Sequence, residues 1–314
     1  MFLRPPCATF KPHMRHYSSK LLLFGEHILL LGARALAVPV PAFRAHWAMR
    51  EPGNAALPLQ KQLQAFAASR ELAQISGLDV TRFQLELQAG LYFDSNIPVG
   101  YGLGSSGALC AAVYDRYAEP KTTELAALKA TFAGMERYFH GQSSGIDPLT
   151  SYLNHALWIE NKTGIRYFEP KPWQQQAPAV FLLDSKLPRQ TSPLVQWFLE
   201  QSRTAEFMRL LEDELFPAHS LMLDGWQNGD LPLFWQGLGQ VSAFQLNHFQ
   251  PMIPGHLRTV WTQCLTNRHC LLKVCGAGGG GFVLGFAASK AIAIKYLDNF
   301  DLIFPFERHE LVEK

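Results

Sequence analysis

The chain has 314 residues, of which 48% are hydrophobic and 17% are charged, and its formal net charge is +2. This composition is typical of a soluble globular protein with a substantial core, and the length allows one large domain or two. The near-neutral charge and the lack of a Lys/Arg block argue against a nucleic-acid partner.

The beginning of the chain predicts neither a secretory signal nor a membrane span. Residues 1–19 are interpreted as an N-terminal tail, since the segment up to His16 contains three prolines and no uninterrupted apolar region. The apolar stretch from Leu21 to Phe43 is interrupted by Glu26 and Arg34, which argues against a membrane span. The five cysteines have no C-x-x-C spacing, so we expect reduced thiols in a cytoplasmic protein and no zinc site.

Two short apolar runs, Leu21–Phe24 and Ile28–Leu31, are predicted to be strands joined by a polar elbow that contains Glu26 and His27. A third extended segment is expected from Ala35 to Trp47. Polar side chains among apolar neighbours need partners. By themselves, the Glu and His therefore predict either a buried pair that holds a turn or part of a site.

The next region is predicted to contain one helix and one strand. Residues 59–76 have a helical pattern. Alternating Phe83, Leu85 and Leu87 predict a half-buried strand that runs towards a glycine-rich loop.

The glycine-rich loop has glycine at positions 100, 102 and 104, followed by Ser105, Ser106 and Gly107. Residues 108–114 then have the composition of a helix. Such a loop can bind a phosphate, because the first N–H groups of a helix lack internal partners and the helix dipole is positive there. Ser106 can cap the helix or bind a metal ion beside the phosphates. The loop is neither a P-loop nor a convincing dinucleotide fingerprint, and an ordinary capped loop stays open as an alternative.

A second cluster contains two acidic residues. Thr122 is predicted to cap a long helix that ends near Phe139, with Glu136 on it, and Asp147 follows in a Ser/Gly-rich loop before Pro148. Two carboxylates in one pocket can divide the work of phosphoryl transfer, one binding Mg²⁺ and the other orienting or deprotonating a hydroxyl. The alternative is a surface glutamate and an aspartate that caps a helix beginning at the proline.

A hairpin, a linker and a further strand are predicted next. Residues 158–161 and 165–168 predict a hairpin, and the Gln/Pro-rich segment after it suggests a linker. Residues 179–184 predict a strand, and the turn that follows carries Lys186 and Arg189. These cations are either solvated or available to an acidic substrate.

The last third of the chain contains one further motif. Residues 192–267 are predicted to be mostly helical and carry no functional motif, whereas residues 271–286 predict a strand, a glycine-rich loop and another strand. A short helix at 290–297 and a closing strand at 302–304 follow.

These motifs resemble those of the GHMP kinases, and of mevalonate kinases most specifically. The loop at 97–107 is similar to P-x-G-x-G-L-G-S-S-[AG], and residues 20–32 to K-x-x-x-x-G-E-H-x-x-x-x-G. Residues 136–147 follow E-R-x-x-H-G-x-x-S-G-x-D, and residues 184–191 resemble a T-K-x-P-R-x-T segment. The loop at 273–281 is similar to K-x-[TS]-G-A-G-G-G-G, with Cys275 in place of the hydroxyl residue. Ser18 and Ser19 stand where the family commonly has Pro-Gly.

The resemblance implies an α+β, two-domain GHMP kinase fold. Its N-terminal domain, like domain 2 of ribosomal protein S5, would cover residues 20–170, and a ferredoxin-like C-terminal domain would cover 171–314. The nucleotide would bind in the cleft between them.

The resemblance also implies the site. The catalytic residues would be Asp147 and Lys20, the Mg²⁺ ligands Ser106 and Glu136, the ATP-binding residues Gly100, Gly102, Leu103, Gly104, Ser105, Ser106, Gly107, Gly278 and Gly279, and the substrate-binding residues Glu26, His27, Lys186, Arg189, Gly276 and Ala277.

The function implied is ATP- and Mg²⁺-dependent phosphorylation of the primary hydroxyl of mevalonate, a step in isoprenoid precursor synthesis. The alternatives are phosphomevalonate kinase, a mevalonate-3-kinase or decarboxylase relative, a sugar kinase, or a non-catalytic homologue that binds a small molecule. The expected partner is a small-molecule substrate, with no nucleic acid and no membrane. The sequence leaves open whether the protein is a homodimer.

Overall fold

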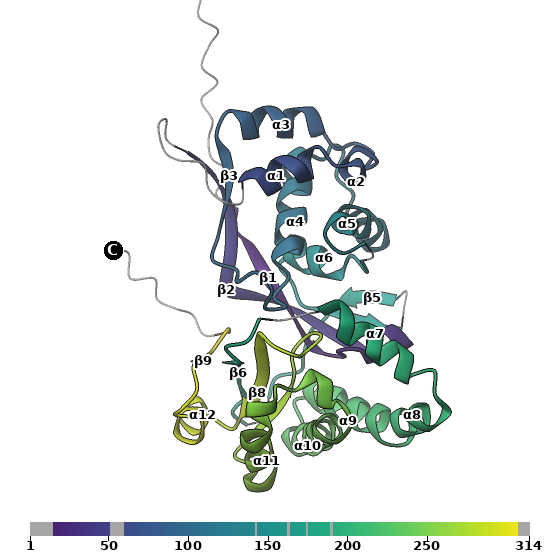
Figure 1. Cartoon of the computed structure of the whole chain (residues 1–314), viewed down its shortest axis with the longest axis vertical. Helices are drawn as coiled ribbons and strands as arrows, with labels where there is room; N and C mark the ends of the chain where they lie inside the picture. The colour runs from purple at the N-terminus through teal and green to yellow at the C-terminus, as the bar shows by residue number, and fades with distance from the viewer. Residues whose placement is uncertain are drawn as a thin grey trace, which may run out of the picture.

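The computed structural model describes residues 15–50, 60–141, 143–161, 164–173, 175–188 and 191–306. Most of the predicted tail therefore lies outside the described residues. Its last three residues, 17–19, are described: they belong to the first strand and are buried. The described chain forms two sheets, one in each half of the molecule, with helices packed on both (Figure 1).

The N-terminal sheet contains five strands among the described residues, all in antiparallel pairs. They are β1 (Tyr17–Phe24), β2 (Ala35–Met49), β3 (Leu91–Ser95), β4 (Leu157–Glu160) and β5 (Gly164–Tyr167). The order is β1-β2-β4-β5, and β3 pairs with the far end of β2. The predicted first strand, the long segment from Ala35 and the hairpin are confirmed.

The second predicted strand is wrong. Residues 28–31 form a short 3-10 helix, η1 (Ile28–Leu31), in which only Ile28 is buried. Gly25 and Gly32 have positive φ angles of 105° and 92°, and the Gly32 N–H closes the turn onto the Leu29 carbonyl. Glycine favours these backbone conformations, so the two glycines turn the chain back before an apolar run can extend.

Helices cover one face of the N-terminal sheet. They are α1 (Gln60–Ala67), α2 (Arg70–Ala73), α3 (Val80–Gln88), α4 (Ser105–Tyr117), α5 (Leu125–His140) and α6 (Ile146–Leu153). The helices α4 and α6 pack against β1 and β2, and Figure 1 shows the other helices of this half stacked beside them.

The predicted strand at Phe83–Leu87 is helix α3. Asp79 caps it by accepting a hydrogen bond from the Arg82 N–H, and Phe83 and Leu87 are buried on one face while Leu85 is 59% exposed. Phe83 and Leu87 are four residues apart, a spacing that places two side chains on the same face of a strand and also on the same face of a helix.

The cap of helix α5 also differs from the prediction. Glu124 is the N-cap, and its carboxylate accepts hydrogen bonds from the N–H groups of Ala126 and Ala127. Thr122 instead accepts a hydrogen bond from the Glu124 N–H, at 3.1 Å. A carboxylate suits this position because the helix dipole is positive there.

The C-terminal sheet has four strands among the described residues, in the order β7-β8-β6-β9 and in antiparallel pairs. They are β6 (Ala179–Asp184), β7 (Cys270–Val274), β8 (Phe282–Ala287) and β9 (Leu302–Ile303). A helical region separates β6 from β7, and one helix separates β8 from β9. This β-α-β-β-α-β order is the ferredoxin-like arrangement.

Residues 191–267 are helical, as predicted. The elements are α7 (Thr191–Gln201), α8 (Ala205–Leu210), a π-helical turn η2 (Leu211–Leu215), α9 (Phe216–Asn228), α10 (Leu231–His248), the 3-10 turns η3 (Gln250–Met252) and η4 (Gly255–Leu257), and α11 (Arg258–Asn267); α12 (Lys290–Tyr296) comes later. The helices α10 and α11 pack against β7.

Aromatic side chains pack across the boundary between the two halves. Phe24 at the end of β1 stacks on Phe286 of β8, with ring centroids 5.8 Å apart, and meets Trp226 of α9 edge-on at 5.2 Å. The chain passes from one sheet to the other between Tyr167 and Ala179. The predicted domain boundary at residue 170 falls in this interval and stays a prediction. Among the described residues, no helix is long and apolar enough to span a membrane.

Candidate functional site

The first glycine-rich loop joins β3 to α4. Gly100, Gly102 and Gly104 all have positive φ angles, of 82°, 80° and 68°. The alternation in the sequence is therefore a backbone requirement of the turn. Gly104 is the N-cap of α4, so Ser106 does not cap the helix but lies in its first turn. The loop is tied to β1, because the Lys20 N–H donates a hydrogen bond to the Leu103 carbonyl at 2.9 Å.

Helix α6 approaches this loop closely. A Cβ atom at Gly107 would lie 2.9 Å from both the carbonyl carbon and the Cβ of Asp147, and one at Gly104 would lie 3.3 Å from Asp147 Oδ2. The missing side chains of these two glycines thus bring the aspartate to the N-terminus of α4.

Asp147 forms an ion pair with Lys20. The Nζ atom of Lys20 lies 2.5 Å from Oδ1 of Asp147, and Lys20 is only 7% exposed. Asp147 does not cap helix α6: Gly145 is the N-cap, the helix begins at Ile146, and Asp147 and Pro148 follow in its first turn. The structure therefore brings the two predicted catalytic residues together.

Glu136 and Ser106 also meet. The Ser106 hydroxyl donates a hydrogen bond to Glu136 Oε1 at 3.2 Å, and Nε2 of His140 lies 3.0 Å from the same hydroxyl oxygen. Ser143 donates a hydrogen bond to the other oxygen of Glu136. Burial, together with the negative charge of Asp147, raises the pKa of Glu136 to about 7.

This pair is a suitable donor set for Mg²⁺. Mg²⁺ prefers oxygen ligands and usually takes one or two carboxylates, completing its shell with water and phosphate oxygens. Among the described residues, no three His, Cys, Asp or Glu side chains are grouped so as to hold a metal by themselves. A site that uses Glu136 and Ser106 would therefore depend on the nucleotide for its remaining ligands.

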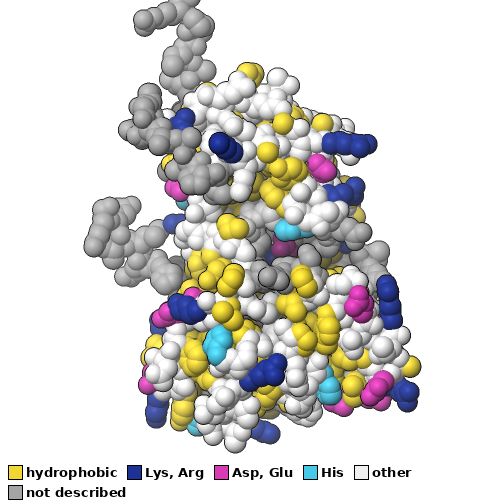
Figure 2. All heavy atoms as spheres, in the orientation of Figure 1, with side chains coloured by type: hydrophobic (Ala, Val, Ile, Leu, Met, Phe, Trp, Pro, Cys, Tyr) yellow, Lys and Arg dark blue, Asp and Glu magenta, His cyan; other side chains and the backbone are white. Residues whose placement is uncertain are grey.

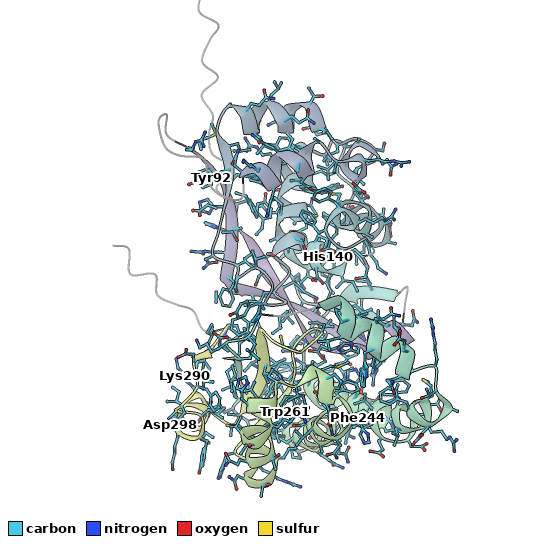
Figure 3. The ribbon with its side chains drawn as sticks, in the orientation of Figure 1. Tyr92, His140, Phe244, Trp261, Lys290 and Asp298 are labelled. Carbon is cyan, nitrogen blue, oxygen red and sulfur yellow. The ribbon has the colours of Figure 1, made fainter. Side chains whose placement is uncertain are left out.

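The cluster lies where the two halves meet. His140, at the end of α5, lies near this junction (Figure 3). Figure 2 shows a recess between the two halves, in which histidine and acidic side chains are visible.

The polar elbow also lies at the junction of the two halves. Glu26 forms a buried ion pair with Lys273 of β7, with Nζ 2.5 Å from Oε1. Burial raises the pKa of Glu26, and the charge of Lys273 opposes this effect. Nε2 of His27 lies 3.2 Å from the Ala277 carbonyl oxygen. Lys273 was not among the predicted site residues, although a lysine inside an otherwise apolar strand was a signal for a buried ionic partner.

The second glycine-rich loop, between β7 and β8, contacts the first. Gly276, Gly278 and Gly279 have positive φ angles, and the Gly279 N–H donates a hydrogen bond to the Met252 carbonyl at 2.7 Å. A Cβ atom at Gly281 would lie 3.1 Å from Cα of Tyr101 in the first loop. The two loops that were predicted to hold the nucleotide are therefore contiguous.

The two predicted substrate cations are placed differently. Lys186 is paired with Asp184 at 3.0 Å and with Asp301, and its hydrogen bonds to Asp301 and Asp184 raise its pKa. The structure therefore binds its ammonium group to carboxylates beside β6 and β9. Arg189 lies outside the described residues. The substrate-binding roles of both residues stay predictions.

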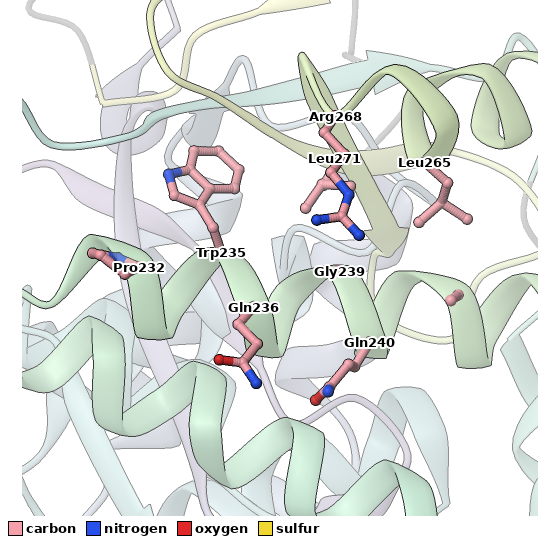
Figure 4. Close-up of a pocket in the computed structure, with 9 residues that line it drawn as sticks. Pro232, Trp235, Gln236, Gly239, Gln240, Leu265, Arg268 and Leu271 are labelled. Carbon is pink, nitrogen blue, oxygen red and sulfur yellow. The ribbon is translucent and has the colours of Figure 1, made fainter.

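A large cavity lies elsewhere. It has a volume of about 710 Å³, lies between α10, the end of α11 and β7, and is lined in part by Trp235, Gln236, Arg268 and Leu271 (Figure 4). None of the predicted site residues lines it. The candidate site is therefore defined by the converging side chains and loops described above.

Part of the chain matches a known protein family. Residues 63–155 match the GHMP kinases N terminal domain. A mevalonate kinase from Thermococcus gammatolerans is 28% identical over 190 residues, which cover 50% of this chain and 53% of that protein. The chain thus spans about half the length of the curated relatives it matches.

Two solved structures share the fold over almost the whole chain. The mevalonate kinase of Methanococcus jannaschii has a TM-score of 0.63 at 18% identity and covers 94% of this chain and 98% of its own. The phosphomevalonate kinase of Streptococcus pneumoniae, in complex with phosphomevalonate and AMPPNP, has a TM-score of 0.64 at 16% identity, with coverages of 92% and 98%. At these identities the likeness shows the fold alone. Residues 63–155 are thus similar in sequence to GHMP kinases, and almost the whole chain shares the fold of the mevalonate kinase and phosphomevalonate kinase structures.

Proposed function

We propose that this protein is an ATP-dependent kinase that phosphorylates the primary hydroxyl of mevalonate. The observation that carries the proposal is the convergence of Lys20, Asp147, Ser106 and Glu136 at the N-terminus of α4. Phosphoryl transfer depends mainly on positioning and charge stabilisation, and this arrangement offers both.

Each group would have a separate task. The N–H groups at the start of α4 would bind phosphate oxygens, as the helix terminus favours. Ser106 and Glu136 would hold Mg²⁺, which when bound neutralises phosphate charge. Asp147 would accept a hydrogen bond from the substrate hydroxyl and orient it, while Lys20 would hold the aspartate in place and stabilise negative charge on the phosphoryl group.

Support for mevalonate as the substrate comes from the sequence. The curated relatives that match are mevalonate kinases, at 28% and 29% identity. The fold does not discriminate between acceptors, since the phosphomevalonate kinase structure is as similar as the mevalonate kinase structure.

The deciding experiment is ADP release by the purified chain with ATP and Mg²⁺, with one acceptor added at a time. Mevalonate-dependent release, absent with 5-phosphomevalonate or galactose, would support the proposal. Release that depends on 5-phosphomevalonate or a sugar would contradict the substrate and keep the reaction class. If the chain binds ATP but releases no ADP with any acceptor, the result would favour a non-catalytic ligand-binding protein.

A further inference from the structure

The backbone at His27 has an unusual conformation. Its φ and ψ angles are 64° and −52°, and the Ile28 N–H donates a hydrogen bond to the Glu26 carbonyl at 2.8 Å. A bond between residues two apart, around a central residue with these angles, is the rare and strained form of the γ-turn. Strained backbone persists only where its surroundings hold it, and it concentrates at functional sites.

The ion pair between Glu26 and Lys273 holds this turn. Glu26 is 4% exposed and Lys273 is 1% exposed, and the lysine also donates a hydrogen bond to the Val274 carbonyl at 3.1 Å. Glu26 follows the last residue of β1 by two positions and Lys273 lies in β7, so the bond joins the two halves of the molecule. Charges this deeply buried strongly restrain each other, because neither has water as an alternative partner.

The His27 side chain reaches the second glycine-rich loop. Its Nε2 atom lies 3.2 Å from the Ala277 carbonyl oxygen, and its ring packs against Phe198 at 5.1 Å and Phe249 at 5.9 Å. Lys273 lies in the strand that leads directly into this loop. The turn and the loop are thus fixed to each other twice, once through the ion pair and once through the histidine.

A purely stabilising role would not explain these features. A buried ion pair adds little stability compared with well-packed apolar residues, and a strained turn subtracts from it. Two such features at one place, beside the predicted substrate-binding residues, favour a role in positioning.

We propose that Lys273 and Glu26 are positioning residues of the kinase site, whose buried ion pair holds the strained turn at His27 and sets the second glycine-rich loop against it. The inference rests on the proposed function for its catalytic consequence. It also changes the role predicted for Glu26, whose carboxylate is bound to Lys273 and acts through His27.

The test is a double variant, Glu26→Gln/Lys273→Met, which removes both charges. Either single variant would leave a buried charge unpaired and could fail to fold, whereas the double variant does not. We expect it to fold cooperatively and to lose about 10²-fold in kcat, as a displacement of about 1 Å in a site does. Lys273→Arg, which keeps the charge, should recover part of the loss.

The matched control is another buried ion pair away from the site. Glu86 and Arg116 are paired at 2.7 Å with side chains 9% and 7% exposed. The double variant Glu86→Gln/Arg116→Met should change the melting temperature to a similar extent and leave kcat unchanged.

Hydrogen exchange provides a second readout that does not need turnover. Amides of residues 25–28 and 275–281 should exchange faster in the Glu26/Lys273 double variant and at the wild-type rate in the control. Wild-type kcat in the double variant would overturn the catalytic consequence of the inference while leaving the proposed function intact. If the wild-type chain phosphorylates no acceptor, the proposed function fails, and unchanged exchange in both segments overturns the positioning itself.

Discussion

Nζ of Lys20 lies 2.5 Å from Oδ1 of Asp147, although one residue is in strand β1 and the other in the first turn of helix α6. The contact forms because α4 and α6 both pack on β1, and α4 has glycine where α6 approaches it. The Asp147 carboxylate, which is proposed to orient the substrate hydroxyl, is thus held both by the charge of Lys20 and by the packing of α6 on α4.

Replacing Asp147 with Asn should reduce kcat by about 10²–10⁴-fold, because the amide cannot take or strongly polarise the hydroxyl proton. ATP affinity should stay close to the wild-type value, since the loop N–H groups are unchanged. Steady-state kinetics and ATP-analogue titration would test both parts. Asp224→Asn, at a surface pair with Arg34, is the control and should leave kcat unchanged. Loss of ATP binding in Asp147→Asn would mean that the aspartate is structural.

Gly107→Ala should damage both stability and activity. The added Cβ would lie 2.9 Å from the backbone of Asp147, so α6 must shift, and overpacking of this kind costs about 1–3 kcal/mol. The melting temperature and kcat should both be lower than in the wild type. Gly239→Ala in α10 is the contrast, because its Cβ would meet only Leu271 Cδ1 at 3.8 Å. That variant should be neutral or more stable by up to about 1 kcal/mol, as expected for alanine in a helix. Wild-type behaviour of Gly107→Ala would contradict the close approach of α6.

Ser106→Ala should raise the Mg²⁺ concentration needed for half-maximal activity, because it removes one of the two proposed protein ligands. A Mg²⁺ titration at saturating ATP measures this directly. Ser202→Ala is a suitable control, since its hydroxyl donates a hydrogen bond to the Phe198 carbonyl within the C-terminal half. An unchanged Mg²⁺ requirement in Ser106→Ala would exclude this hydroxyl as a ligand.

Acid should destabilise the fold through His219. Burial lowers its pKa from 6.5 to about 4, and its Nε2 atom lies 2.8 Å from the Arg34 carbonyl oxygen. Between these two pH values the unfolded chain binds a proton that the folded chain does not, so stability falls as the pH falls through this window. The full effect is about 3 kcal/mol at 1.36 kcal/mol per pKa unit.

His219→Gln should therefore flatten the dependence of unfolding free energy on pH between 6.5 and 4. Urea unfolding at several pH values measures this slope. His256→Gln, at an exposed position, should leave the slope at its wild-type value. An equal slope in wild type and His219→Gln would show that other groups control acid unfolding.

Local patterns predicted the elements where one signal dominated. The three alternating glycines before Ser105 predicted the loop and the helix after it, because glycine readily adopts the positive φ angles that such a turn requires. Local patterns gave wrong predictions where the spacing of apolar residues suits both a strand and a helix. They also failed where two residues could each take the same N-cap position. Phe83 and Leu87 suit a strand or a helix face, and only the Asp79 cap decides between them. Asp147 before Pro148 resembles a cap, yet Gly145 takes that position with a left-handed backbone.

The sequence did not predict which residues far apart in the chain pair with each other. Glu26 was recognised as a polar residue that needs a partner, but its partner lies in the other half, at Lys273. Tertiary packing decides such pairings, and nothing near either residue encodes the match.

The strand β1 has further consequences for how the protein moves. Lys20 in this strand contacts the first glycine-rich loop, while Phe24 at its end is stacked into the aromatic cluster of the other half. The two halves are therefore not independent bodies joined by a single linker, and separating them would expose both the aromatic rings and the buried ion pair. During the proposed reaction the two halves would therefore stay in contact with each other.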